Sequence, residues 1–257
     1  MAKGSTVAKK TTKKSASQVE VEDRHGLDLR EEATRLEKLA PEKRIAWALD
    51  TFSGKIAMSS SFGAQSAVSL HMITRQWPDI PVILIDTGYL FEETYDFIGQ
   101  LTDRLSLNLQ VYSNPMTPAW QEKKFGKLWE NGVDGIEQYN EMNKVEPMDR
   151  ALRDLTVETL FSGLRRQQST TRENMPVVVS QRGRIKVHPI IDWTDMQVGN
   201  YLVENELPYH PLWEEGYISI GDWHTSHKLT DGMNEEDSRF FGLKRECGLN
   251  EDVDFQI

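Results

Sequence analysis

A run of hydroxyl side chains at positions 59–66, SSSFGAQS, is the first part of this 257-residue sequence that could bind a ligand. The run follows a short apolar stretch and precedes an amphipathic one, so we expect it to connect a strand to the start of a helix. Backbone N–H groups at a helix N-terminus, together with hydroxyls, bind anions such as phosphate. The same serines could instead simply cap the turn. The candidate anion ligands are Ser60, Ser61, Gly63, Gln65 and Ser66.

The only cysteine, Cys247, is the second candidate, because a cysteine thiolate is a nucleophile. It stands in a charged segment near the end of the chain, where Lys244 and Arg245 favour the thiolate and burial is difficult. The alternative is a buried, unreactive side chain. A single cysteine also excludes a disulfide within the chain and any cluster or zinc site held by several thiolates. We therefore expect a reactive Cys247, assisted by Lys244 and Arg245, and no metal.

A second loop, Asp86-Thr87-Gly88, follows the apolar run at 81–85. Ligands of open α/β sheets bind beyond the carboxyl ends of strands, so Asp86, Thr87 and Gly88 are candidates for holding an adenine or a ribose. The alternative is an ordinary turn in which Gly88 supplies a positive φ.

Basic and imidazole side chains supply the remaining candidates. Arg165 and Arg166 follow an apolar run, and a guanidinium can bind phosphate or sulfate through two parallel hydrogen bonds, although most arginines are solvated surface charges. We expect His224 to line the site. His188 and His210 each stand beside a proline, where a structural role is the better expectation.

Alternating apolar and amphipathic segments predict the elements that must position these side chains. The pattern is that of repeated βαβ units, which form a parallel sheet of five or six strands with helices on both faces. The expected strands lie at 55–60, 81–86, 107–112, 158–164, 176–180 and 184–191. The expected helices begin at Asp28, Pro41, Ala67, Phe91 and Thr194, the last with a capping box formed by Thr194 and Gln197.

Composition sets the domain organisation. Residues 1–20 are rich in lysine and poor in apolar residues, which predicts a disordered tail. We expect one α/β nucleotide-binding domain at 21–221 and a mobile arm at 222–257 that carries Cys247. The net charge of −10 argues against nucleic-acid binding, no apolar run is long enough to cross a membrane, and the start has no secretory signal. We therefore expect a cytoplasmic protein.

From about residue 55 to residue 250 the sequence resembles the phosphoadenylyl-sulfate reductases. The resemblance is carried by SSSFGAQS, ILIDTGYLFEETY, AWQEKKFGKLW, NKVEPMDRAL, GLRRQQS, PIIDW, YHPLWEEGY and RFFGLKRECGL. The serine loop, residues 59–66, also looks like the S-G-G-x-D-S pyrophosphate loop of the ATP-pyrophosphatase superfamily. Phe62 stands in place of a Gly and Gln65 in place of the Asp. The resemblance implies an adenine nucleotide alpha-hydrolase-like fold. A neutral Gln65 suits a phosphate or phosphosulfate oxygen without a bridging metal.

The resemblance also implies a reaction. Phosphoadenylyl sulfate would bind with its phosphosulfate at the serine loop, and Cys247 would attack sulfur, so that reduced thioredoxin or glutaredoxin later releases sulfite. It implies no cofactor and a homodimer. Related adenylyl-sulfate reductases hold an iron–sulfur cluster with cysteine pairs, where this chain has Lys144-Val145-Glu146-Pro147 and Asp222-Trp223-His224-Thr225.

Two other functions compete with this interpretation. One is an ATP-using adenylyl or sulfur transferase on the same fold, against which Gln65 and Cys247 both count. The other is a nucleotide-binding regulatory protein that has lost the reaction, against which the intact Cys247 segment counts. Assays of sulfite release and of pyrophosphate release distinguish them.

Overall fold

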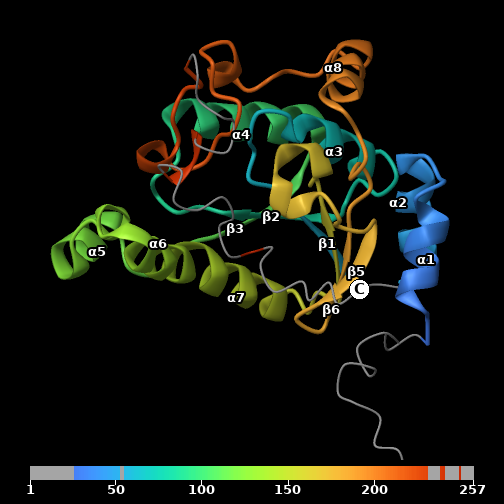
Figure 1. Ribbon diagram of the computed structural model, residues 1–257, viewed down its shortest axis with the longest axis horizontal. Coiled ribbons are helices and arrows are strands. Elements are labelled where there is room, and N and C mark those ends of the chain that lie inside the picture. Colours follow the sequence, from blue (N-terminus) through green and yellow to red (C-terminus); the bar gives the residue numbers. More distant parts are fainter. Residues whose placement is uncertain (1–25, 53–54, 231–237, 241–248, 250–257) are drawn as a thin grey trace, which may run out of the picture.

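The computed structural model describes residues 26–52, 55–230, 238–240 and 249, which form an α/β fold around a six-stranded sheet (Figure 1). The strands are β1 (Ile56–Ser59), β2 (Pro81–Ile85), β3 (Asn108–Tyr112), β4 (Thr159–Ser162), β5 (Val178–Gln181) and β6 (Arg184–Val187). Their order across the sheet is β3-β2-β1-β4-β6-β5, and neighbours run parallel except for the antiparallel pair β5–β6. The predicted mostly parallel sheet is confirmed.

The helices connect and cover these strands. They are α1 (Leu29–Leu36), α2 (Pro41–Thr51), α3 (Ser66–Thr74), α4 (Glu92–Leu105), α5 (Pro118–Phe125), α6 (Gly132–Asn140), α7 (Glu146–Asp154) and α8 (Asp195–Glu204). Sequence periodicity predicted α1–α4 and α8 but not α5–α7. A π-helical turn, Glu141–Val145, joins α6 to α7. Pro147 has no N–H to donate one turn back, and the helix passes this point through the wider turn.

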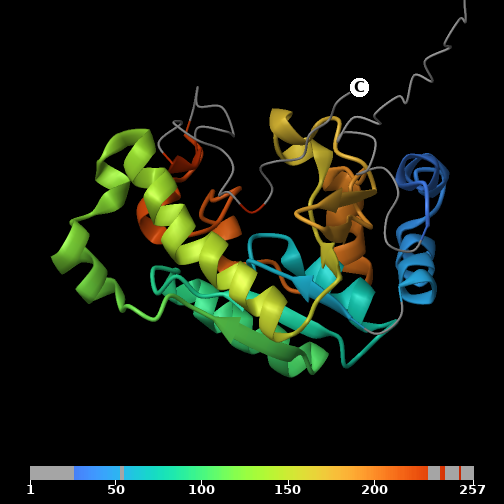
Figure 2. The same cartoon turned by 90° about the horizontal axis from the view of Figure 1, so that it is seen from below.

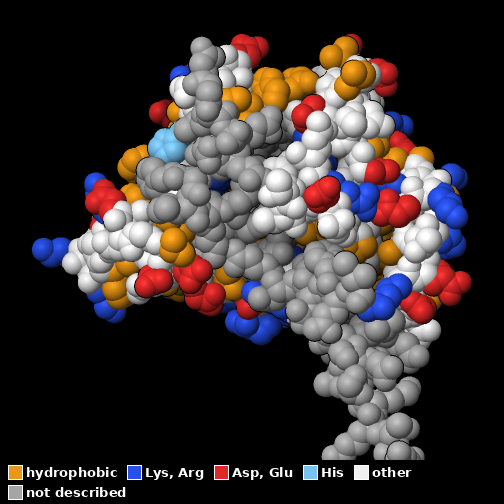
Figure 3. All heavy atoms as spheres, viewed as in Figure 1, with side chains coloured by type: hydrophobic (Ala, Val, Ile, Leu, Met, Phe, Trp, Pro, Cys, Tyr) orange, Lys and Arg blue, Asp and Glu red, His pale blue; other side chains and the backbone are white. Residues whose placement is uncertain are grey.

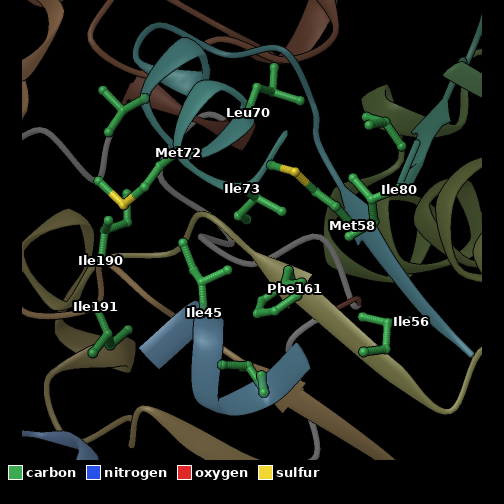
Figure 4. Close-up of a cluster of buried hydrophobic side chains, with 14 of the residues drawn as sticks. Ile45, Ile56, Met58, Leu70, Met72, Ile73, Ile80, Phe161, Ile190 and Ile191 are labelled. Carbon is green, nitrogen blue, oxygen red and sulfur yellow. The ribbon is translucent and has the colours of Figure 1, made fainter. Parts of the chain in front are cut away.

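The two faces of the sheet carry different hydrophobic clusters, because successive strand residues point to opposite sides. On β1, Ile56 and Met58 belong to the larger cluster, which α1–α4 and α8 help to form. Figure 4 shows Ile56 and Met58 in this cluster with Ile73 of α3. Ala57 belongs instead to the smaller cluster with Met148 of α7. Figure 2 shows α7 crossing the sheet on that side, so the prediction of helices on both faces is confirmed.

The strand order creates a switch point beside β1. The chain runs from β1 outward to β2 and β3, and then returns to place β4 on the other side of β1. The loops that leave β1 and β4 therefore diverge in opposite directions. A crevice opens between them at the carboxyl ends of the strands, which is where open α/β sheets bind ligands.

The boundary that we predicted at residue 222 is wrong, because Asp222 is part of the folded body. Its side chain is 1% exposed, and its backbone forms a β-bridge with Leu90. Trp223 donates its N–H to the carbonyl of Tyr89, and Ser226 forms a β-bridge with Arg239. The segment has no sequence periodicity because polar contacts of buried side chains, such as Asp222 with Thr87 and Lys144, hold it in place.

The predicted tail at 1–20 lies outside the described residues, as does most of the predicted arm beyond residue 230. Within the described residues, no helix is both long and apolar enough to cross a lipid bilayer.

Candidate active site

A cavity of about 360 Å³ lies beyond the carboxyl ends of β1 and β4, at the switch point of the sheet. It is lined by the serine loop, by the turn at 162–165 that leaves β4, by Thr87 after β2 and by the segment 218–222. Cavities of a few hundred Å³ bury small-molecule ligands. The predicted ligands Ser60, Ser61, Gly63, Gln65, Ser66 and Thr87 all line it.

The serine loop presents unused polar groups to this cavity. Helix α3 begins at Ser66, and its N-cap residue Gln65 makes no side-chain hydrogen bond to the first turn. Among the residues that the structure describes, the buried Ser66 Oγ finds no hydrogen-bond partner. Such a hydroxyl is costly to bury without a partner, so it is suited to a ligand that supplies one.

Phe62 holds the loop in an unusual backbone conformation. Its φ is +49°, in the left-handed region that a residue with a side chain adopts at a cost of roughly 1–2 kcal/mol. The phenylalanine ring is fully buried in the larger hydrophobic cluster, and this burial offsets the cost. Phe62 stands where the similar pyrophosphate loop has a glycine, and its side chain packs against the core instead.

Arg165 lines the cavity, but its guanidinium is already bound to protein atoms. Nη2 donates to Gln65 Oε1 at 2.6 Å and to Asp195 Oδ1 at 2.7 Å, and Nη1 donates to the carbonyl of Trp193 at 3.2 Å. The residue is 3% exposed. Both N–H groups of Nη2 and one of Nη1 are therefore taken by protein oxygens, so the two terminal nitrogens together do not present a free fork here, and Arg165 as a ligand of phosphate or sulfate stays a prediction.

Arg166 does not line the cavity. Its guanidinium pairs with the Glu37 carboxylate and also donates from Nε to the carbonyl of Met175. It therefore fastens the turn after β4 to the segment after α1. Adjacent residues on an extended turn point in different directions, which is why only one of the two arginines reaches the cavity.

Asp86 and Gly88 also lie outside the cavity lining. Asp86 Oδ1 accepts hydrogen bonds from the Gly88 N–H and from the Tyr95 hydroxyl. Gly88 has φ +73°, and a Cβ there would lie 2.6 Å from the Pro118 side chain. Of these three candidates only Thr87 reaches the site, while Asp86 and Gly88 shape the turn that presents it.

Thr87, Asp222 and Lys144 form a buried charged cluster in the cavity wall. Thr87 Oγ1 donates to Asp222 Oδ1 at 2.6 Å, and Lys144 Nζ lies 2.6 Å from Asp222 Oδ2. Burial by itself would raise the pKa of Asp222, but the Lys144 ammonium and the Thr87 hydrogen bond outweigh it and lower that pKa. The carboxylate is therefore ionised and the lysine charge is balanced.

His224 does not line the cavity, contrary to our prediction. Its ring stacks on Trp129 at a centroid distance of 3.7 Å and meets the Tyr89 and Tyr139 rings edge-on. Burial lowers the pKa of His224 to about 4. A neutral ring packed among aromatic rings supports the wall from behind, whereas Asp222, two positions earlier, lines the cavity.

The cavity is basic although the chain is acidic. Its described basic side chains are Lys144, Arg165, Arg172, Arg182, Arg184, Lys186 and Arg239, and its described acidic ones are Asp149, Asp195 and Asp222. Asp195 and Asp222 are paired with two of those cations. On the face shown in Figure 3, the red and blue side chains of the described residues are interspersed.

Lys144, Lys186 and Arg239 were not predicted as site residues. Arg184 and Lys186 are two positions apart on β6, so they point to one side of that strand, which is a signal that the sequence did contain. Lys144 and Arg239 reach the cavity only through the fold. The predicted site residues Cys247, Lys244 and Arg245 lie outside the described residues. Within the part of the chain that the structure describes, no three or more His, Cys, Asp or Glu side chains lie together in a way that could hold a metal ion.

The sequence is similar to a known family and to known proteins over most of its length. Residues 55–228 match the model of the phosphoadenosine phosphosulfate reductase domain. A phosphoadenosine 5′-phosphosulfate reductase of Vibrio cholerae serotype O1 is 58% identical over 226 residues, which cover 88% of this chain and 89% of that protein. One of Escherichia coli O157:H7 is 60% identical over 225 residues, covering 88% and 92%.

Solved structures agree with the sheet described above. A phosphoadenylyl-sulfate reductase from Candida auris, solved as a phosphate complex, superposes with a TM-score of 0.69 at 32% identity, covering 78% of this chain and 96% of that one. The FMN adenylyltransferase of Candida glabrata superposes with a TM-score of 0.57 at 15% identity, covering 79% and 68%. The second likeness concerns the fold alone.

Proposed function

Because the chain belongs to the phosphoadenosine phosphosulfate reductase family, we propose that it reduces 3′-phosphoadenylyl sulfate to sulfite and adenosine 3′,5′-bisphosphate in sulfate assimilation. The observation that carries the proposal is the cavity. A serine loop with an unpartnered hydroxyl and a mostly basic lining face one volume large enough for part of a nucleotide.

The substrate would bind with its 5′ phosphosulfate against the serine loop. There the Ser66 hydroxyl, the Gln65 amide and the N-terminus of α3 offer hydrogen-bond donors and a favourable dipole. The 3′ phosphate carries close to two further negative charges and would face the basic side chains contributed by the β5–β6 hairpin, Arg182 and Arg184 among them.

Cys247 is the proposed nucleophile. Its thiolate attacks the sulfur of the phosphosulfate, the sulfur–oxygen bond to phosphate breaks, and adenosine 3′,5′-bisphosphate departs with that electron pair. The sulfonate is left on Cys247 Sγ. Support comes from the described residues on either side in the sequence, since both Arg239 and Leu249 line the cavity. Basic side chains there would stabilise the charge on the departing phosphate.

A dithiol completes the reduction in this proposal. One thiolate of reduced thioredoxin or glutaredoxin attacks Cys247 Sγ and releases sulfite, leaving a mixed disulfide. The second thiolate resolves that disulfide, so the dithiol is oxidised, sulfur(VI) becomes sulfur(IV) and Cys247 is restored. We extend the proposal to a cytoplasmic homodimer without a cofactor on the basis of the family resemblance.

The test is an assay of sulfite release from 3′-phosphoadenylyl sulfate with reduced thioredoxin, run beside an assay of pyrophosphate release from ATP. Thioredoxin-dependent sulfite release without pyrophosphate release is the expected result. Pyrophosphate release would instead indicate an adenylyl or sulfur transferase. Tight nucleotide binding without either product would indicate a regulatory protein.

A further inference from the structure

The Gln65 side-chain amide has a fixed orientation in the cavity wall. Arg165 Nη2 lies 2.6 Å from it, and a guanidinium carries only hydrogen-bond donors, so the amide atom that faces Arg165 must be the oxygen. The other amide atom, Nε2, has no acceptor in the part of the chain that the structure describes. Gln65 lines the cavity, so its N–H groups are available to a ligand there.

Arg165 is itself held on two sides. Asp195 Oδ1 accepts from the same Nη2 at 2.7 Å, and the Trp193 carbonyl accepts from Nη1. Asp195 is the first residue of α8, whose start is fixed by a capping box between Thr194 and Gln197. Arg165 is 3% exposed, so its guanidinium has little freedom to turn toward another partner.

The charges cancel in the corner of the site that Gln65, Arg165 and Asp195 form. Arg165 and Asp195 form an ion pair, and Gln65 is neutral. The corner therefore offers an N–H donor without a net charge of its own. A carboxylate at position 65 would leave two carboxylates around one guanidinium, which would repel an anion unless a cation such as Mg²⁺ came with it.

We propose that Asp195 and Arg165 are positioning residues that hold Gln65 as an N–H donor to an anionic oxygen of the substrate, and that Gln65 makes the site selective for an anion without bound metal. The inference rests on the proposed function, because it assigns that oxygen to the phosphosulfate group. It gives Arg165 a role through Gln65 rather than as a direct phosphate ligand.

A double-mutant cycle tests this assignment. Gln65→Ala, Arg165→Met and the double variant are compared by calorimetric titration with adenosine 3′,5′-bisphosphate and with inorganic phosphate, in chelator. Loss of a hydrogen bond to a charged group weakens binding by about tenfold to a hundredfold. If Arg165 acts through Gln65, each single variant loses affinity and the double variant binds no worse than the weaker single variant. Additive losses would overturn the inference, because they would mean that Arg165 contacts the ligand independently.

Arg166→Met is the matched control for charge. It removes the same charge one position along the chain, outside the cavity lining, and should change the dissociation constant by less than about twofold. A loss equal to that of Arg165→Met would mean that long-range charge explains both, which contradicts a positioning role.

Substitutions at Asp195 give a second route that does not disturb the buried arginine. Asp195 is about half exposed at a helix start, so both variants are expected to fold. Asp195→Asn keeps an oxygen that accepts from Arg165 and should retain most of the affinity, whereas Asp195→Ala should lose it. Equal affinities for the two variants would count against the proposal.

Gln65→Glu examines selectivity. It should bind phosphate more weakly than Gln65→Ala in chelator, and added Mg²⁺ should recover part of the loss only in the glutamate variant. Tighter phosphate binding by Gln65→Glu than by Gln65→Ala would overturn the assignment of Gln65 as a donor.

These outcomes separate the inference from the proposed function. An unchanged protein that releases no sulfite but shows a non-additive cycle with phosphate would refute the reductase proposal and keep the positioning role. An unchanged protein that releases sulfite but shows additive losses in the double-mutant cycle would keep the reductase proposal and refute the positioning role. Failure of the unchanged protein to bind either ligand would overturn both.

Discussion

The ammonium of Lys144 and the carboxylate of Asp222 lie 2.6 Å apart and are both buried in the wall of the cavity. The pair joins the turn before α7 to the segment that leads toward Arg239, and Thr87 adds the loop after β2. Lys144 Nζ also lies 5.0 Å from the centre of the Phe240 ring. One ion pair thus ties together three segments that border the site.

Breaking this pair should destabilise the fold. Asp222→Asn leaves the buried Lys144 ammonium without a counter-charge, which costs about 3–5 kcal/mol of the free energy of unfolding in comparable pairs. Lys144→Met combined with Asp222→Asn removes both charges and should recover much of that loss. Urea titration of the single and double variants measures it. A double variant as unstable as the single Asp222→Asn variant would show that the charge pairing is not the cause.

Cys247→Ser should abolish sulfite formation while leaving the dissociation constant for adenosine 3′,5′-bisphosphate nearly unchanged. The substitution removes the proposed nucleophile but no proposed phosphate ligand. Thioredoxin-dependent sulfite release and calorimetric titration are the two measurements. Turnover above about 1% of the unchanged protein would remove Cys247 from the mechanism.

Activity should not depend on a metal. One cysteine cannot ligate an iron–sulfur cluster, and the neutral Gln65 stands where related ATP-cleaving loops carry an acid. We expect full turnover in chelator and no stoichiometric iron by elemental analysis. Iron at one cluster per chain, or loss of turnover in chelator that Mg²⁺ restores, would contradict the proposal.

The 3′ phosphate should decide substrate choice. We expect kcat/KM for 3′-phosphoadenylyl sulfate to exceed that for adenylyl sulfate by about a hundredfold, or roughly 2.7 kcal/mol of transition-state binding. Arg182→Gln and Arg184→Gln should narrow this ratio, because both side chains line the cavity. Arg166→Gln is the control and should leave the ratio unchanged. Equal values of kcat/KM for both nucleotides in the unchanged enzyme would mean that the enzyme does not recognise the 3′ phosphate.

Stability should fall in mild acid because of a buried histidine. His188 is 1% exposed, and burial, assisted by nearby Lys186 and Arg172, lowers its pKa from 6.5 to about 3. The unfolded chain therefore binds a proton that the folded chain excludes, so the contribution of His188 is complete above pH 6.5 and is lost as the pH falls toward 3. At pH 5 the loss is roughly 2 kcal/mol.

Guanidinium chloride titrations at pH 7 and pH 5 measure this effect, with His188→Gln as the comparison, because glutamine can hydrogen-bond but does not titrate. The difference between the free energies of unfolding at pH 7 and at pH 5 should be smaller in His188→Gln than in the unchanged protein. An unchanged difference would assign the acid sensitivity to other groups, of which His210 and His224 are two, since burial lowers the pKa of each from 6.5 to about 4.

Local sequence patterns were sufficient for the main elements of the sheet. Alternating and helical periodicities located β1–β6, and the Thr194–Gln197 capping box located the start of α8, because these signals depend on neighbours a few positions away. Helices α6 and α7 were missed because Pro147 and the π-helical turn interrupt the pattern. Helix α5 was missed because it buries Gln121 and no apolar stripe. The boundary at residue 222 was misplaced because polar burial leaves no periodic signal.

By itself, the sequence determined the serine loop, the single cysteine, the resemblance to a family and the parallel sheet that places loop ends together. Only the tertiary structure decided which side chains share the cavity. It turned Arg165 toward Gln65 and Asp195, turned Arg166 away to Glu37, buried His224 against Trp129 and brought Lys144 to Asp222. The physical reason is that a long polar side chain takes the partner that satisfies its hydrogen bonds in the folded state, and that partner can be a hundred residues away in the chain.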